Sequence, residues 1–164
     1  MWSCCFFYKK IFVFLFLCFI IYIKIIAKKD LNMVYPVVES AVDVAYWLFD
    51  KASDTRSELD DYKMQQMLFL AQLLFAKTYN HEMMFPSLFI CDENGFFEPN
   101  MQKILAQGRP FMPRAKFNAR VNEFLEELWE KYAAISSREM KNFILNSSIY
   151  AEFALKGKKS LVDF

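Results

Sequence analysis

Two side chains in this sequence, His81 and Cys91, are of the types that act together in cysteine–histidine enzymes. Such an enzyme needs a thiolate with an imidazole within hydrogen-bond reach, and usually a third group that orients the imidazole. His81 is the only histidine among the 164 residues, and it lies ten residues before Cys91, a spacing that by itself provides neither contact. We interpret Cys91 as a buried, inert thiol and His81 as a surface residue, and we expect no catalytic residues.

The acidic residues likewise do not match a known metal or cofactor site. The sequence DENG at residues 92–95 begins like a calcium loop, but its glycine stands at the fourth position and no glutamate closes a twelve-residue loop. We find no zinc-ligand spacing, glycine-rich phosphate loop or nucleophile elbow. Four glutamates at helical spacing are typical of a solvated helix face: Glu123, Glu126, Glu127 and Glu130. The sequence predicts no metal and no cofactor.

One cluster of charges has a sign opposite to that of its surroundings. Residues 1–32 hold five lysines and one aspartate, so the remaining residues hold 15 basic and 18 acidic side chains and carry a net charge of −3. A body of that sign is not expected to bind nucleic acid. Within it, four basic residues share a stretch of twelve residues without an acid: Arg109, Arg114, Lys116 and Arg120. The simpler interpretation is an ordinary basic loop; the functional one is a docking site for an acidic protein partner, where such charges speed association.

The first 32 residues differ in character from the rest. Residues 11–23 are uniformly apolar, too few to span ~30 Å of hydrocarbon, although counting through Lys24 reaches the lower limit of about 17 residues. Phe, Ile, Lys, Tyr and Asn make up 20 of these 32 residues, as expected when AT-rich upstream DNA is translated from a start placed too early. We therefore interpret Met33 as the true start. The alternative is a membrane anchor through residues 11–27.

Cysteine usage favours a reducing compartment. Cys4, Cys5 and Cys18 belong to the N-terminal segment, which leaves Cys91 alone in residues 33–164. A single cysteine cannot form an internal disulfide, so we expect a cytoplasmic protein. Association with a membrane is expected only if the apolar N-terminal run is translated.

The apolar residues of the body repeat at helical spacing. The pattern i, i+3, i+4, i+7 over residues 38–49 predicts a first helix, which the polar run 53–58 should end. The same pattern over residues 64–75 predicts a second helix with Asp60 as its N-cap. Leu70 and Leu73 add a second apolar side to this helix, so we expect it to be central and the most buried.

The remaining elements are shorter. We predict helices over residues 99–107, 117–132 and 147–156, and another that starts at a capping box formed by Ser136 and Glu139. Residues 84–97 are typical of a short extended segment or hairpin, in which Pro86 predicts an edge strand. The sequence thus predicts a single, mainly α-helical domain of five or six helices over residues 33–164.

Three segments of this body resemble one known family. Residues 42–48 (VDVAYWL) look like the family's first helix. Residues 59–72 (LDDYKMQQMLFLAQ) are similar to its hallmark helix, written around K-L-Q-K-L-L-Y-x-A-Q, and residues 128–132 (LWEKY) with the Ser136 cap resemble its W-x-x-Y-G-x-x-S segment. The family is the SocA-like antitoxin family, also called the Panacea domain, which is common in bacteria and their prophages. The resemblance covers about residues 38–160.

The sequence departs from the family pattern at Lys77 and Thr78, where a glycine-containing approach to a turn is more usual, and in two later loops, as a divergent member would. The family's Y-G-P-V signature is replaced by ENGFFEP at residues 93–99. Its late T-H and P-W pairs are replaced by NSSIY at residues 146–150.

The resemblance implies a protein that is not an enzyme. Members neutralise a co-encoded toxin, either by binding it directly or by delivering it to a protease as an adaptor. The implied partners are therefore a cognate toxin and, for an adaptor, a protease. A membrane-anchored interaction or structural protein without a toxin partner is the alternative.

Overall fold

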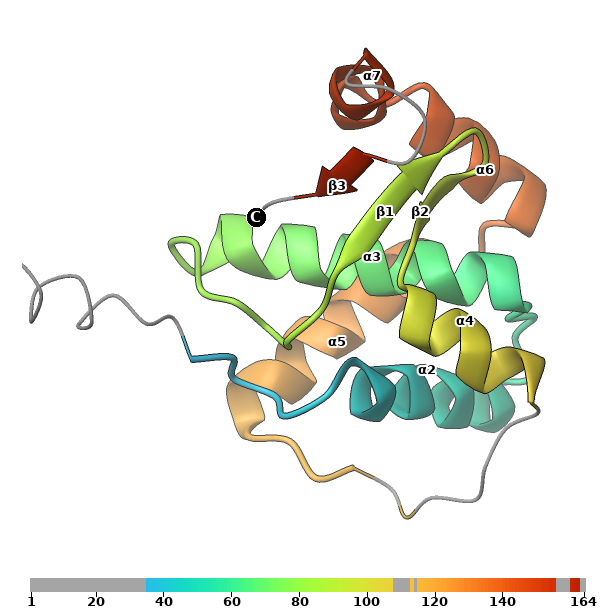
Figure 1. Ribbon diagram of the computed structural model, residues 1–164. Helices are drawn as coiled ribbons and strands as arrows, with labels where there is room; N and C mark the ends of the chain where they lie inside the picture. The colour runs from blue at the N-terminus through green and yellow to red at the C-terminus, as the bar shows by residue number, and fades with distance from the viewer. Residues whose placement is uncertain (1–34, 108–112, 114, 156–159, 163–164) are drawn as a thin grey trace, which may run out of the picture. The chain divides into compact units, whose positions relative to one another are not determined.

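Six helices and three strands form the part of the chain that the computed structural model describes, residues 35–107, 113, 115–155 and 160–162 (Figure 1). These residues belong to one compact unit. The predicted mainly helical class with a short hairpin is confirmed; the N-terminal segment 1–32 lies outside the described residues. In chain order the elements are α2 (Ala41–Thr55), α3 (Asp61–Thr78), β1 (Phe89–Asp92), β2 (Gly95–Phe97), α4 (Pro99–Ala106), α5 (Ala119–Tyr132), α6 (Ser137–Leu145), α7 (Ser148–Leu155) and β3 (Ser160–Val162).

Polar side chains fix the starts of most of these helices, because the first backbone N–H groups of a helix have no partner within it. The carboxylate of Asp60 accepts a hydrogen bond from the backbone N–H of Lys63 at 2.8 Å, as predicted for α3. The predicted capping box of α6 is also present: Glu139 N–H donates to Ser136 Oγ at 3.3 Å, and Ser136 N–H donates to Glu139 Oε2 at 2.9 Å.

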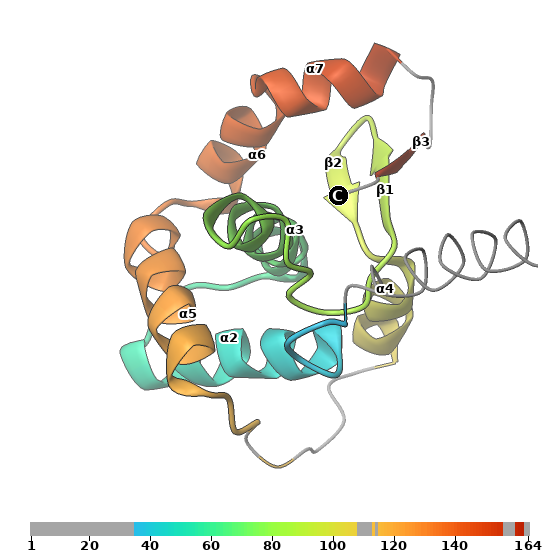
Figure 2. The same ribbon diagram turned by 90° about the vertical axis from the view of Figure 1, so that its left-hand side faces the viewer.

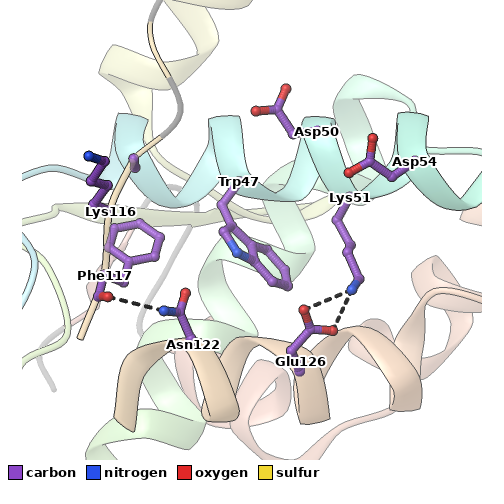
Figure 3. Close-up of a pocket in the computed structure, with 9 residues that line it drawn as sticks. Trp47, Asp50, Lys51, Asp54, Lys116, Phe117, Asn122 and Glu126 are labelled. Atoms are coloured by element: carbon purple, nitrogen blue, oxygen red, sulfur yellow. Dashed lines mark hydrogen bonds and ion pairs between the residues drawn. The ribbon is translucent and has the colours of Figure 1, made fainter. Parts of the chain in front are cut away.

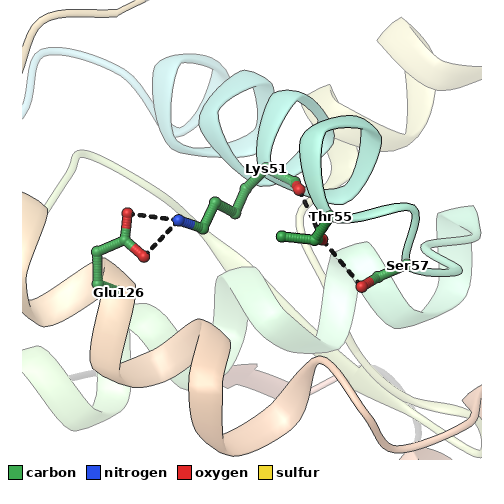
Figure 4. Close-up of polar contacts among 4 residues, drawn as sticks. All are labelled: Lys51, Thr55, Ser57 and Glu126. Atoms are coloured by element: carbon green, nitrogen blue, oxygen red, sulfur yellow. Dashed lines mark hydrogen bonds and ion pairs between the residues drawn. The ribbon is translucent and has the colours of Figure 1, made fainter.

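Helix α2 is longer than the sequence pattern predicts, since it continues into the polar run and ends at Thr55. The Thr55 hydroxyl donates to the backbone carbonyl of Lys51 at 2.8 Å and also contacts the hydroxyl of Ser57 at 2.9 Å (Figure 4). Arg56 then adopts a left-handed conformation with φ of 53° and terminates the helix. The last three residues of α2, 53–55, are exposed, so polar residues are compatible with this end of the helix.

Helix α3 is the central element, as predicted. Viewed along its axis, it lies among α2, α5, α6 and the hairpin (Figure 2). Its apolar residues are buried on more than one side: Met64, Met67, Leu68, Phe69, Leu70, Ala71, Phe75 and Ala76. The ring of Phe69 stacks on that of Phe96 in β2 at 3.7 Å between centroids, and the ring of Phe89 in β1 meets Phe69 edge-on at 5.5 Å. The hairpin therefore packs directly on α3.

The strands form a small antiparallel sheet in the order β2-β1-β3. Ile90 pairs with Phe97 of β2 on one side and with Leu161 of β3 on the other. The prediction that Pro86 marks an edge strand is wrong, because β1 begins three residues later, at Phe89, and lies in the middle of the sheet. A proline has no N–H group to donate to a neighbouring strand, and this limits only the strand that contains the proline. Pro86 lies before β1, so it does not prevent β1 from pairing on both sides.

Candidate partner-binding site

The four basic residues predicted to bind a partner have different settings. Arg109 and Arg114 lie outside the described residues. Lys116 is exposed and lies in the segment that leads into α5. Arg120, in the first turn of α5, forms an ion pair with Glu82, with Nη2 at 2.6 Å from Oε2 and Nη1 at 3.3 Å from Oε1.

Arg120 also packs on aromatic rings. Its guanidinium carbon lies 4.9 Å from the ring centroid of Tyr79 and 5.5 Å from that of Phe75, distances at which cations are attracted to ring faces. The side chains of Arg120 and Glu82 are 41% and 44% exposed, so solvent screens their attraction. We conclude that Arg120 joins α5 to the end of α3, and that Lys116 is better placed than Arg120 to meet a partner.

Lys116 lines a cleft of about 610 Å³ at the surface formed by α2, the start of α5 and the segment before α5. In Figure 3 the indole of Trp47 lies between Phe117 and Lys51, and it points from α2 toward α5. Both aromatic residues are half-buried. The side-chain amide of Asn122 donates to the backbone carbonyl of Phe117 at 3.0 Å, which attaches the segment before α5 to that helix. We call this surface the α2–α5 cleft.

An ion pair joins the two helices in this cleft. Lys51 Nζ lies 2.6 Å from Glu126 Oε2 and 2.7 Å from Oε1 (Figures 3 and 4). The same ammonium group lies 5.8 Å from the ring of Trp47. The interpretation of Glu126 as part of a solvated face missed this contact, because its partner is 75 residues away in the sequence. Glu123, Glu127 and Glu130 are exposed, in agreement with that interpretation.

Cys91 and His81 lie where a buried thiol and a surface histidine were expected. Cys91 is 2% exposed in the middle strand β1. Burial and the neighbouring charge of Asp92 raise the pKa of its thiol, which disfavours the reactive thiolate. His81 is exposed in the turn after α3, with φ of 66°. Within the described residues, no group of three or more His, Cys, Asp or Glu side chains is arranged to hold a metal ion.

Two glutamines of the hallmark-like helix hold the hairpin. Gln66 donates from Nε2 to the Phe96 carbonyl at 2.8 Å and accepts at Oε1 from the Phe96 N–H at 3.2 Å. Gln65 accepts from the Glu98 N–H at 2.9 Å and donates to the Glu98 carbonyl at 3.4 Å. Each side-chain amide thus satisfies both backbone groups of one residue. The sequence did not indicate this role, since the distances to Phe96 and Glu98 along the chain are 30 and 33 residues.

Two further polar residues of the same helix are buried and bonded. Lys63, 2% exposed, donates from Nζ to the backbone carbonyls of Ala133 at 2.7 Å and Glu58 at 3.0 Å. Burial lowers the pKa of Lys63, against the opposing effect of the nearby acids Asp60 and Glu58. Gln72 accepts from the Phe85 N–H at 3.2 Å. The polar residues that carry the family resemblance therefore organise the interior of this domain.

Comparison of the chain with protein-family models, with curated proteins and with solved structures finds no match. Among the helices of the described residues, none has the length and apolarity needed to cross a membrane.

Proposed function

We propose that this chain is an antitoxin-like protein that acts in the cytoplasm and neutralises a co-encoded toxin by protein–protein binding. The observation that supports a binding role best is the α2–α5 cleft, where Trp47 and Phe117 remain half-exposed beside charged side chains. Tryptophan is enriched among the residues that dominate binding energy at protein interfaces, and polar or charged residues form the rim around them.

The toxin partner is proposed from the family resemblance, and the exposed aromatic and charged residues of the α2–α5 cleft support the proposed position of the interface. The residues that resemble the family are largely internal: Lys63, Gln65, Gln66 and Gln72 bind backbone groups, and Trp129 and Tyr132 belong to the core. Such residues support a shared fold. They do not define a binding surface, so we assign the interface to the exposed cleft instead.

Two routes of neutralisation start from the same complex. Direct inhibition requires only that the toxin stays bound, whereas an adaptor must also deliver it to a protease. Measuring the lifetime of the toxin in cells with and without this protein distinguishes the two, because only the adaptor route shortens it.

The test expresses the product of the adjacent gene together with this protein and scores bacterial growth and a pull-down. The wild-type protein should bind the toxin and restore growth. The variant Lys116→Glu should associate markedly more slowly, because a basic charge at the edge of an interface steers an acidic partner. Lys103→Glu is the matched control, since Lys103 is an exposed lysine of α4 that does not line the cleft.

Failure of the wild-type protein to bind or rescue against any neighbouring gene product would contradict the antitoxin proposal itself. Unchanged binding by both Lys116→Glu and Trp47→Ala would leave the activity intact but move the interface away from the α2–α5 cleft.

A further inference from the structure

A second cleft, of about 370 Å³, lies among the first half of α3, the hairpin turn with β2, and the end of α4. We call it the hairpin cleft. It has no residue in common with the α2–α5 cleft among the described lining residues. The side chains that matter for its chemistry are Asp61, Tyr62, Asp92, Phe97 and Leu105.

The frame of this cleft is held by several specific contacts. Gln65 and Gln66 fix the backbone of β2 and the residue after it to α3, as described above. The Tyr62 hydroxyl donates to the backbone carbonyl of Asn94 in the hairpin turn at 2.8 Å. Gly95 has φ of +123°, and a Cβ atom there would lie 2.8 Å from Gln66 Oε1. A site held in this way loses little conformational freedom when it binds, which favours affinity.

The walls of the cleft offer partly exposed apolar surface. Tyr62, Phe97 and Leu105 are half-buried and come from α3, β2 and α4 respectively. Such surface suits the aliphatic stem of a long side chain or an apolar neighbour, because long cationic side chains bury their stems while the charged group stays near water.

The charge of the cleft is negative. Asp61 is exposed, Asp92 is half-buried, and no lysine or arginine is present among the described lining residues. Lys141 of α6 lies beside the hairpin turn, where its Nζ donates to Asn94 Oδ1 at 2.9 Å, and the two aspartates outnumber it. Asp92 Oδ1 accepts from the Asn94 N–H at 2.8 Å, and the two oxygens of a carboxylate have room for more donors. The pKa of Tyr62 is raised to about 12, first by burial and then by the charges of Asp92 and Asp60. The same negative potential attracts a cation.

We propose that the hairpin cleft binds a basic side chain of a partner polypeptide, a lysine or arginine with an apolar neighbour, through Asp61, Asp92 and the apolar walls. The charge complementarity selects this occupant: the carboxylates bind the cationic group, while Tyr62, Phe97 and Leu105 contact the apolar part. This site is distinct from the proposed toxin interface, because it lies on another surface of the protein and binds a basic group, whereas the α2–α5 cleft is proposed to bind an acidic partner.

The test uses the full chain and a fluorescein-labelled peptide of alternating leucine and arginine, measured by fluorescence anisotropy. The wild-type protein should bind it, and added salt should weaken binding. Asp61→Asn/Asp92→Asn should weaken binding by roughly tenfold or more, as expected when charges opposite a bound cation are removed. The change Asp92→Asn retains a side-chain oxygen that can accept the hydrogen bond from the Asn94 N–H. Glu123→Gln/Glu127→Gln makes the same change of charge on exposed residues of α5 and should bind like the wild type.

Three results would overturn the proposal: no measurable binding, equal weakening by both double variants, or equal binding of a peptide with glutamate in place of arginine. Thermal melts by circular dichroism establish that each variant is folded. Sedimentation provides a further check, because dimerisation that the two aspartate changes abolish would assign the cleft to a second copy of the chain. None of these measurements involves a toxin, so their failure is distinct from failure of the proposed function.

Discussion

Leu68 lies in the middle of α3 and has no exposed surface. We expect Leu68→Ala to lower the free energy of unfolding by about 2–5 kcal/mol, because the lost apolar contacts leave a cavity that tightly packed neighbours fill only in part. A urea titration followed by circular dichroism measures the change. Leu155→Ala is the matched control, since Leu155 is 89% exposed and should be close to neutral. A small effect at Leu68 would mean that α3 is not the central helix.

Glu139 gives the stability of the fold a dependence on pH. Its hydrogen bonds from the backbone and side chain of Ser136 hold its pKa below the ordinary value of 4.5. A carboxyl group whose pKa is lower in the folded state stabilises the fold above the unfolded value, and this contribution is lost as the pH falls through the folded pKa. Glu139→Gln removes the ionisation but keeps an acceptor for Ser136.

We therefore expect the wild type to be more stable than Glu139→Gln at neutral pH, and the difference to shrink as the pH falls below 4.5. Urea titrations at a series of pH values measure it. Curves that stay parallel across the whole range would contradict this role of Glu139.

Single residues were predictable from the sequence where their contacts are local. Asp60 and Ser136 cap their helices through partners three residues away, a spacing that can be recognised along the chain. The Arg120–Glu82 pair joins residues 38 positions apart, and no local pattern indicates such a contact. The basic cluster could therefore be recognised in the sequence, whereas the ion pair of Arg120 with Glu82 could not.

At the scale of elements, the attachment of the hairpin to α3 depends on side-chain amides. We expect Gln66→Leu to cost roughly 1–3 kcal/mol for each backbone group of Phe96 that it leaves buried without a partner. Hydrogen exchange at the Phe96 amide should accelerate in the same variant. Gln102→Leu, at an exposed position of α4, is the control. Unchanged exchange at Phe96 would mean that water or another group replaces Gln66.

The helices were predictable as elements because an apolar stripe at 3.6-residue spacing extends over several turns. The strands were less predictable from the sequence. β1 has four residues, and β2 and β3 have three each, too few to show alternation, so β3 was not predicted at all. The central position of β1 depends on pairing with β3, which lies about 70 residues further along the chain. Long-range pairing of this kind leaves no local signal.

At the scale of the whole molecule, one hydrophobic core includes residues from all six described helices and both strands of the hairpin. We expect a single cooperative unfolding transition, since each of these helices contributes buried residues to the same core. Urea curves from far-ultraviolet and near-ultraviolet circular dichroism should coincide. Separate midpoints would show that the described unit contains two independently folding parts.

Each of the two clefts is lined by residues from several elements, so it is a property of the folded molecule as a whole. The α2–α5 cleft brings Trp47 and Glu126 to one surface, and the hairpin cleft does the same for Asp61 and Asp92. Each set is dispersed in the sequence, so residue types and spacing did not reveal either cleft. Lys116, which lines the α2–α5 cleft, could be singled out from the sequence because it belongs to a local cluster of charge.

The contacts of Gln65 and Gln66 have a consequence for how this molecule behaves among others of its kind. Strand β2 is an edge of the sheet, and an exposed edge can accept a strand from another molecule and so promote aggregation. The backbone groups of alternate residues in an extended segment point to the same side, and those of Phe96 and Glu98 are all bonded to the two glutamines. The protein thereby closes this edge to intermolecular strand addition with side chains of its own central helix.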